Sequence, residues 1–370
     1  MTSVKIVPAQ ELRRFAEEAF RACGAPEATA RTAAEVLCYA DENGFDTHGV
    51  ANLERIYVAR LLDGRIDPQA EFELTAETAS IAALDARGGL GLAAGARAME
   101  LAIAKAAETG IGCVAVRRSS HFGSAGYYTQ QAVRRGMIGI AMTNLGSQAI
   151  ARPPGGSAAM LGTNPIAMGA PGEGHPPFQL DMSTTVVATG KIKAALRRGE
   201  PIPEGWLVDD EGRPVTDPAA YEEGRGHLQL LGGDLATGGA KGFGLALMVD
   251  ILCGALSGAE MGPHERLLSP EGREAGAEDA NVGHFFLAID PARFRPDGGF
   301  EREMGGMLGA LLACPPAREG GRVVYPGFLE AARASREQVE LDAALARQLD
   351  GLAERLGLVP PREPAAAERG

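Results

Sequence analysis

The stretch GIGCVAVRRSSHFGSAGYYTQQAVRRGMIGIAMTN, Gly110–Asn144, decides the fold class. It contains two short apolar runs suited to buried strands, residues 110–118 and 136–144, with a helical segment between them. Upstream, SIAALDARGG (Ser80–Gly89) is predicted to be a further strand, and residues 92–108 a helix with its apolar side chains on one face. This alternation of strand and helix predicts an α/β fold.

The flanking regions extend this pattern. Residues 8–41 predict an antiparallel helix pair broken at CGAP, and PIAMGAP, PFQLDMS and VGHFFLAIDPARF predict strands. Residues 182–198 predict a helix, residues 199–218 an irregular loop, and residues 242–256 a buried helix. We expect an N-terminal helical segment (1–70), a central α/β region (71–310), a C-terminal helical segment packing with the N-terminal one (311–358) and a disordered tail (359–370).

The totals restrict the class of ligand. The chain has 370 residues, a formal net charge of −12 and, by composition, a pI near 5.1, which argue against a nucleic-acid backbone or an anionic membrane surface as partner. Five widely spaced cysteines in apolar settings indicate reduced core thiols, and the N-terminus lacks the apolar core of a signal peptide. Asp250 in the middle of GFGLALMVDILCGALSGA argues against a membrane span. We therefore expect a cytoplasmic protein with a small-molecule ligand.

The first candidate for chemistry is His48 in DTHGV, Asp46–Val50. The hydroxyl of Thr47 adjoins it, and Gly49 leaves space beside the ring where a ligand could approach. Taken alone, a histidine after a helix is more often a capping or packing residue.

A second histidine strengthens the case for a site. RRSSHFGSAGYY places His121 at the end of a buried strand and before a helix, where open parallel sheets bind ligands. In FQLDMSTT, Asp181 emerges from an apolar strand; it can cap the helix that follows, orient a histidine, or do both.

Three further motifs have a functional and a structural interpretation. Thr163 and Asn164 in LGTNPIAMGAP suit an amide or a ribose hydroxyl, or form an ordinary Asx turn. Lys241, between glycines before an apolar helix, suits a phosphate, or is a solvated lysine. GGLGLAAG (Gly88–Gly95) matches a loose dinucleotide-binding pattern, but no acidic residue follows at the expected distance, so a tight strand-to-helix turn is favoured. The remaining histidines lack ligand spacing, and we predict no metal.

Taken in order, these motifs resemble a known family. DTHGV, SSHFGSAGYY, MTN followed by PPGG, GTNPIA, DMST, the loop IPEGWLVDDEGRPVTDP, GAKGFG and VYPG resemble the type 2 malate/L-lactate dehydrogenases, a family that includes ureidoglycolate dehydrogenases, sulfolactate dehydrogenases and piperideine-2-carboxylate reductases. The resemblance runs from about residue 5 to residue 340. It implies an oxidoreductase that uses NAD or NADP, a non-Rossmann NAD(P)-binding α/β fold with helical N- and C-terminal segments, and a homodimer whose site lies between domains.

The resemblance also implies roles for individual residues. Thr47 and His48 match the family's serine–histidine pair, Asp181 looks like the aspartate that completes the relay, and His121 matches a histidine assigned as proton acceptor in some relatives. We expect His48 to be the general acid and base, with Thr47 and Asp181 fixing its tautomer, and His121 to polarise the substrate or share the proton. Residues that match cofactor contacts are His121, Asn144, Thr163, Asn164, Pro165, Ser183, Thr184, Lys241, Gly242, Pro326 and Gly327.

The chain departs from the family pattern beside His48. Relatives usually carry an arginine that clamps the substrate carboxylate where this chain has Asn52. We expect Arg55 or Arg152 to supply the missing cation, or the substrate to differ in its acid group. Phe328 also stands where relatives commonly carry glutamate. Two alternatives to a 2-oxo or 2-hydroxy acid enzyme follow: a reductase of a cyclic imine derived from an amino acid, and a non-catalytic homologue that only binds the cofactor.

Overall fold

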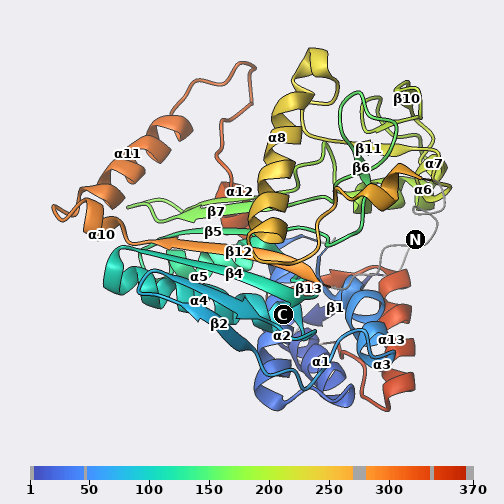
Figure 1. Cartoon of the computed structure of the whole chain (residues 1–370), viewed down its shortest axis with the longest axis horizontal. Coiled ribbons are helices and arrows are strands. Elements are labelled where there is room, and N and C mark those ends of the chain that lie inside the picture. The colour runs from blue at the N-terminus through green and yellow to red at the C-terminus, as the bar shows by residue number, and fades with distance from the viewer. Residues whose placement is uncertain (1–3, 46–47, 270–280, 334–336, 364–370) are drawn as a thin grey trace.

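A seven-stranded mixed sheet forms the centre of the computed structural model, which describes residues 4–45, 48–269, 281–333 and 337–363 (Figure 1). Its strands, in spatial order, are β2 (Glu73–Glu77), β3 (Ile81–Asp85), β4 (Ile111–Ser119), β12 (Val282–Ile289), β5 (Ile138–Thr143), β7 (Ile166–Ala170) and β8 (Phe178–Met182). These bounds confirm the predicted strands. Among the neighbouring strands described in this sheet only β3 and β4 run parallel, so His121 follows a strand of a mixed sheet rather than of the open parallel sheet that was expected.

Helices cover both faces of this sheet. α4 (Gly91–Thr109) and α5 (Ala125–Val133) pack on one face, against Val114, Val116 and Phe286 among others. On the other face, Val249 of α8 (Gly239–Asp250) and Cys253 of the π-helical Ile251–Ala255 pack against Met142 and Phe285. Because side chains alternate along a strand, each central strand contributes to both cores. The layers are visible in Figure 1, where α4 and α5 lie below the sheet and α8 stands above it.

The two ends of the chain meet in a helical region beside the sheet. The expected helix pair is confirmed as α1 (Ala9–Ala22) and α2 (Glu27–Asn43), which lead into the 3-10 turn Val50–Asn52, the π-helical Leu53–Val58 and α3 (Ala59–Leu62). β1 (Lys5–Pro8) pairs antiparallel with β13 (Gln338–Leu341), a strand that the sequence analysis missed, and α12 (Phe328–Arg333) and α13 (Ala343–Leu356) flank it in the chain. The proposed division into domains stays a prediction.

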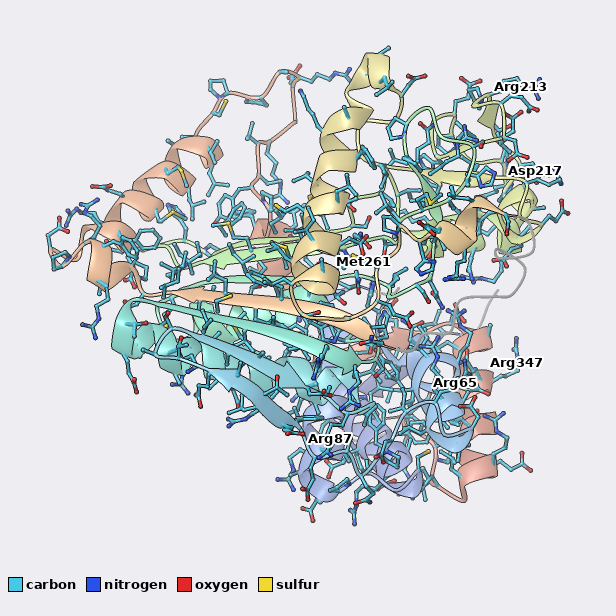
Figure 2. The ribbon with its side chains drawn as sticks, viewed as in Figure 1. Arg65, Arg87, Arg213, Asp217, Met261 and Arg347 are labelled. Atoms are coloured by element: carbon cyan, nitrogen blue, oxygen red, sulfur yellow. The ribbon has the colours of Figure 1, made fainter. Side chains whose placement is uncertain are left out.

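A smaller lobe carries a second sheet with its own core. Its strands are β10 (Pro214–Val215), β9 (Leu207–Val208), β11 (His227–Gln229) and β6 (Ala151–Arg152), and α6 (Thr189–Arg198) and α7 (Ala219–Glu222) belong to the same lobe. The predicted helix over 182–198 is therefore too long, because α6 begins at Thr189, and the predicted loop over 199–218 contains β9 and β10. Arg213 and Asp217 project from the rim of this lobe (Figure 2).

The remaining elements correct two further expectations. The strand predicted over 282–294 ends at Ile289, since Asp290 caps α10 (Pro291–Phe294) by accepting from Ala292 N at 3.0 Å. α11 (Gly299–Leu312) follows. Of the tail predicted to be disordered, residues 359–363 are described, and Arg14 donates to the Val359 carbonyl at 3.4 Å.

Two properties of the described residues bear on the expected class of protein: membrane-spanning helices and the state of the cysteines. No helix there is long and apolar enough to cross a membrane. The cysteines are all free thiols; Cys23, Cys38 and Cys253 are buried and Cys113 half-buried, whereas Cys314 is exposed, so the expectation of a core thiol is wrong at that position.

Candidate active site

His48 and His121 lie face to face, with ring centroids 6.1 Å apart and ring planes inclined by 17°. His48 follows α2 and His121 follows β4, so the helical region and the central sheet each contribute one imidazole. Both side chains are half-buried, which leaves part of each ring accessible. The structure thus brings the two predicted histidines together. Thr47, their predicted companion, lies outside the described residues.

Asp181, near the end of β8, is held by the start of another helix. Its Oδ2 accepts hydrogen bonds from Ser124 Oγ and from Gly126 N, both at 2.8 Å. These donors lie at the N-terminal end of α5, where unpaired N–H groups and the helix dipole favour an anion. Asp181 therefore caps α5, and the expectation that it caps the helix following it in sequence is wrong, because that helix begins eight residues later at Thr189.

Opposing effects act on the pKa values of Asp181 and His48. Burial raises the pKa of the Asp181 carboxyl, while the Gly126 N–H, the Ser124 hydroxyl and the charge of His48 act in the opposite direction. Burial lowers the pKa of His48 below its usual value, and the Asp181 carboxylate partly offsets this effect. The arrangement pairs an imidazole that is neutral at neutral pH with a carboxylate that stabilises its protonated form.

The surroundings of His121 are different. Its Nδ1 lies 2.7 Å from Tyr57 Oη and accepts a hydrogen bond from Gly123 N at 3.2 Å. Burial lowers the pKa of His121 to about 3, and the positive charges of His48, Arg60 and Arg55 act in the same direction. His121 is therefore neutral throughout the physiological pH range.

A buried histidine supports the segment that carries His121. The ring of His284 stacks on Phe122 with centroids 4.7 Å apart, and its two nitrogens contact Thr143 Oγ1 at 2.7 Å and Ser119 Oγ at 2.8 Å. Burial lowers the pKa of His284 to about 3. His284 is therefore a packing residue that supports the segment carrying His121.

Two glycine motifs have structural explanations. A Cβ on Gly49 would lie 2.1 Å from Asp41 Oδ1, and Asp41 Oδ2 accepts from Val50 N at 2.9 Å, so Gly49 makes room for a capping carboxylate. The interpretation that Gly49 admits a ligand beside His48 is therefore wrong. In GGLGLAAG, Gly91 N donates to Ser120 Oγ at 2.9 Å and a Cβ on Gly91 would lie 2.0 Å from Ser120 O. The favoured tight turn is confirmed, and it packs against the residue preceding His121.

Several predicted cofactor residues converge between the lobes. Thr184 donates to Thr163 O through its N at 2.9 Å and its Oγ1 at 3.0 Å, and Leu231 N donates to Thr184 O at 2.8 Å. Leu231 O in turn lies 2.1 Å from where a Cβ on Gly242 would be. Neighbouring Ser183 is half-buried and Lys241 is exposed in the first turn of α8. The segments containing Thr163, Ser183 and Lys241 are therefore adjacent.

Two predicted cofactor residues, Asn144 and Asn164, are 1% and 0% exposed. Asn144 Nδ2 donates to Asp250 Oδ1 at 3.0 Å, and Asn164 Nδ2 donates to Asp250 Oδ2 at 2.7 Å. Gly262 N adds a third donor at 3.1 Å. The two asparagines thus hold the end of α8 against the sheet, and half-buried Pro165 follows Asn164.

The predicted YPG turn lies beside β8. Gln179 N donates to Pro326 O at 2.9 Å. Gly327 has a φ of +95°, and a Cβ on it would lie 2.8 Å from Gln179 N, so this position favours glycine. Gln179 lies two residues before Asp181, so β8 both contacts this turn and carries the carboxylate.

The candidate substrate residues occupy unlike positions. Asn52 is buried in the 3-10 turn, and Arg55 is exposed on the π-helical segment. Arg152 is buried in the small lobe, where its Nη1 donates to Asp209 O at 2.6 Å. In the described part of the chain, no group of His, Cys, Asp and Glu side chains is placed to hold a metal ion.

Four residues of this site were not predicted from the sequence: Tyr57, Asp41, Ser124 and Gly126. Ser124 and Gly126 lie in the SSHFGSAGYY motif, so a search for helix N-terminal donors facing an acid could have found them. Tyr57 carries no local signal, because its contact with His121 joins residues that are 64 positions apart in the chain.

Comparison with known proteins identifies the family of this chain. Residues 7–350 match the model of the family described as malate/L-lactate dehydrogenase. The chain belongs to this family. It is similar to the malate dehydrogenase of Pyrococcus abyssi, with 42% identity over 82% of this chain and 81% of that relative. It superimposes on the crystal structure of malate dehydrogenase from Entamoeba histolytica with a TM-score of 0.89 and 30% identity, covering 97% of this chain and 100% of the other. The fold class and the family resemblance are thereby confirmed, and the chain is an oxidoreductase.

Other members of the family differ in cofactor. The (2R)-3-sulfolactate dehydrogenase (NADP(+)) of Chromohalobacter salexigens is 37% identical over 93% of this chain and 97% of its own length. The ureidoglycolate dehydrogenase (NAD(+)) of Escherichia coli O157:H7 is 35% identical over 86% of each. Relatives are therefore named for both nicotinamide dinucleotides.

Proposed function

We propose that this chain catalyses hydride transfer between NAD or NADP and C2 of a 2-oxo or 2-hydroxy acid, with His48 as the acid and base. The observation that supports it most is the pair of accessible imidazoles, one beside the Asp181 carboxylate and the other beside hydrogen-bond donors. The names of the relatives support the substrate and cofactor classes.

The residues present fit a dinucleotide. The exposed Lys241 in the first turn of α8 and the positive end of the dipole of this helix suit a pyrophosphate, and the adjacent Thr163 and Ser183 provide hydroxyl and backbone groups for ribose or amide. We assign contact roles to the Thr163, Ser183, Lys241 and Pro326–Gly327 segments. We assign Asn144 and Asn164 the role of positioning α8, because their amides are buried on Asp250.

Each side chain then has a defined task. When bound, the nicotinamide supplies or takes the hydride. In oxidation His48 takes the hydroxyl proton of the substrate, and in reduction it returns that proton to the oxygen on C2. Asp181 stabilises the imidazolium formed in between, and His121 polarises the same oxygen.

We further propose that Arg55 is the cation that binds the substrate carboxylate. It lies in the turn following Asn52, its charge lowers the pKa of His121, and no described residue forms an ion pair with it. Arg152 is less suited, since its guanidinium already donates to the Asp209 carbonyl.

A substrate panel tests the proposal. Oxidation of NADH and of NADPH is followed with pyruvate, oxaloacetate, 3-sulfopyruvate and a cyclic imine carboxylate. Turnover of an oxo acid is expected; preference for the imine would favour the alternative reductase, and cofactor binding without turnover would favour the non-catalytic homologue.

Arg55→Ala is expected to raise KM at least tenfold with kcat little changed, whereas Arg152→Ala, the matched control, leaves KM unchanged. The reverse pattern would transfer the carboxylate contact to Arg152.

We also propose that the chain forms a homodimer. α8 is apolar around most of its circumference, yet Ile251 and Leu256 just beyond it are 58% and 60% exposed, and Met307 on α11 is 51% exposed. An apolar helix with so much exposed surface is typical of a subunit interface. Light scattering after size-exclusion chromatography is expected to give twice the mass of the chain, and Ile251→Glu to give monomers.

A further inference from the structure

We propose that Tyr57 fixes the tautomer of His121, so that this ring presents an N–H to the substrate oxygen and leaves proton transfer to His48. Tyr57 is a positioning residue in this scheme, because it acts through His121. The inference deepens the proposed function and rests on it.

The backbone N–H of Gly123 restricts the tautomer of His121. This group can only donate, and it points at His121 Nδ1 from 3.2 Å. This donor favours a lone pair on Nδ1, which in a neutral imidazole places the proton on Nε2. The Tyr57 hydroxyl, 2.7 Å from the same Nδ1, is consequently a donor too.

The position of Tyr57 makes this donor permanent. Its side chain is fully buried and packs edge-on against Phe20, with ring centroids 6.0 Å apart and planes at 75°. Burial raises the pKa of the phenol, so it stays protonated. A π-helical turn, residues 53–58, carries it; such turns are frequent at functional sites, because the extra residue re-aims the side chains that follow.

The tautomer of His121 determines which of the two imidazoles can transfer the proton. With Nδ1 accepting two hydrogen bonds and Nε2 protonated, His121 has no free lone pair for a substrate proton. It can donate to the oxygen on C2, where negative charge develops as hydride leaves or arrives. His48, which faces the Asp181 carboxylate, is left as the group that gains and loses the proton.

Nitrogen-15 NMR of the histidine rings in the full-length protein tests the tautomer directly. With each histidine assigned by substitution, His121 is expected to show a protonated Nε2 and an unprotonated Nδ1 throughout pH 5–9. A protonated Nδ1 in the wild type would overturn the proposal. This readout requires no turnover, so a protein inactive on every substrate would refute the proposed function and leave the tautomer assignment standing.

Kinetics test the role of the hydroxyl. Tyr57→Phe keeps the ring but removes the shorter of the two contacts to Nδ1, so that only the Gly123 N–H at 3.2 Å still favours this tautomer. The variant is expected to populate the other His121 tautomer in part and to lower kcat about tenfold with KM little changed, the size of one lost hydrogen bond. Tyr128→Phe, the matched control, removes an equally buried hydroxyl that donates to the Phe122 carbonyl, and is expected to change neither the tautomer nor kcat. Equal effects of both substitutions on kcat, or an unchanged His121 spectrum in Tyr57→Phe, would reduce Tyr57 to a packing residue.

Discussion

The two imidazoles of the site lie parallel and 6.1 Å apart, yet their surroundings are opposite in kind. His48 faces a carboxylate that is anchored to the start of α5. His121 faces two hydrogen-bond donors, Tyr57 and Gly123, and positively charged groups. Burial lowers the pKa of both rings; in the first environment the carboxylate partly offsets this effect, and in the second the nearby positive charges add to it. The difference shows how one residue type can serve proton transfer at one position and polarisation at another within one site.

The sharpest way to break this comparison is to remove the imidazole beside the carboxylate. His48→Gln keeps a polar side chain but cannot exchange a proton, so kcat is expected to fall about 10³-fold in either direction. The measurement is steady-state reduction of the best 2-oxo acid, with cofactor binding by fluorescence as the control. A loss below about tenfold would show that another group carries the proton.

Replacing the second imidazole separates its two possible roles. The amide of His121→Gln can donate from nearly the place of Nε2 but cannot accept a proton, whereas His121→Ala can do neither. We expect His121→Ala to lower kcat about 10²-fold and His121→Gln to recover most of that loss. If both variants lost activity equally, His121 would be a base, and the contrast with His48 would disappear.

Weakening the carboxylate tests its influence on His48. Asp181→Asn removes the charge that holds the pKa of His48 up against burial, so this pKa is expected to fall further. Oxidation needs neutral His48, and its kcat/KM falls as pH drops through that pKa; the inflection should therefore move to lower pH. Reduction needs the protonated ring, so at pH 7 it is expected to slow about tenfold. An unmoved inflection would mean that Asp181 does not act on the titrating group.

The smallest effect is on stability. The pKa of His121 and of His284 is about 3, so between that pH and the usual histidine pKa of 6.5 the unfolded chain binds more protons than the folded one. The free energy of unfolding is expected to fall, as pH is lowered below 6.5, by about 1.4 kcal/mol per pH unit for each ring. Free energies of unfolding, measured by urea titration at several pH values, should depend less steeply on pH in His284→Gln than in the wild type. The pH dependence should be unchanged in His264→Gln, whose side chain is exposed. Equal slopes in all three proteins would contradict the burial argument.

The sequence predicted six strands of the central sheet and the helix pair, because apolar periodicity is a local signal. The positions of His48 and His121 at element ends and the family resemblance together suggested that the two share a site. The sequence prediction misplaced the start of α6, since Thr184 and Val186 form backbone hydrogen bonds to Thr163, Leu231 and Gln229 rather than a helix turn. It also misread Gly49 and the cap formed by Asp181. Both depend on groups elsewhere in the chain, Asp41 and Gly126, that no local pattern joins to them.

The turn at Pro326 protects the chain against aggregation through its outermost strand. β8 is the last strand of the central sheet, and the Pro326 carbonyl occupies one of the hydrogen-bonding positions on its outer side. An uncovered outer strand is a template on which another molecule can add its own. A chain truncated before residue 325 would expose that template beside Asp181, and we expect it to assemble into β-rich aggregates as it loses catalysis.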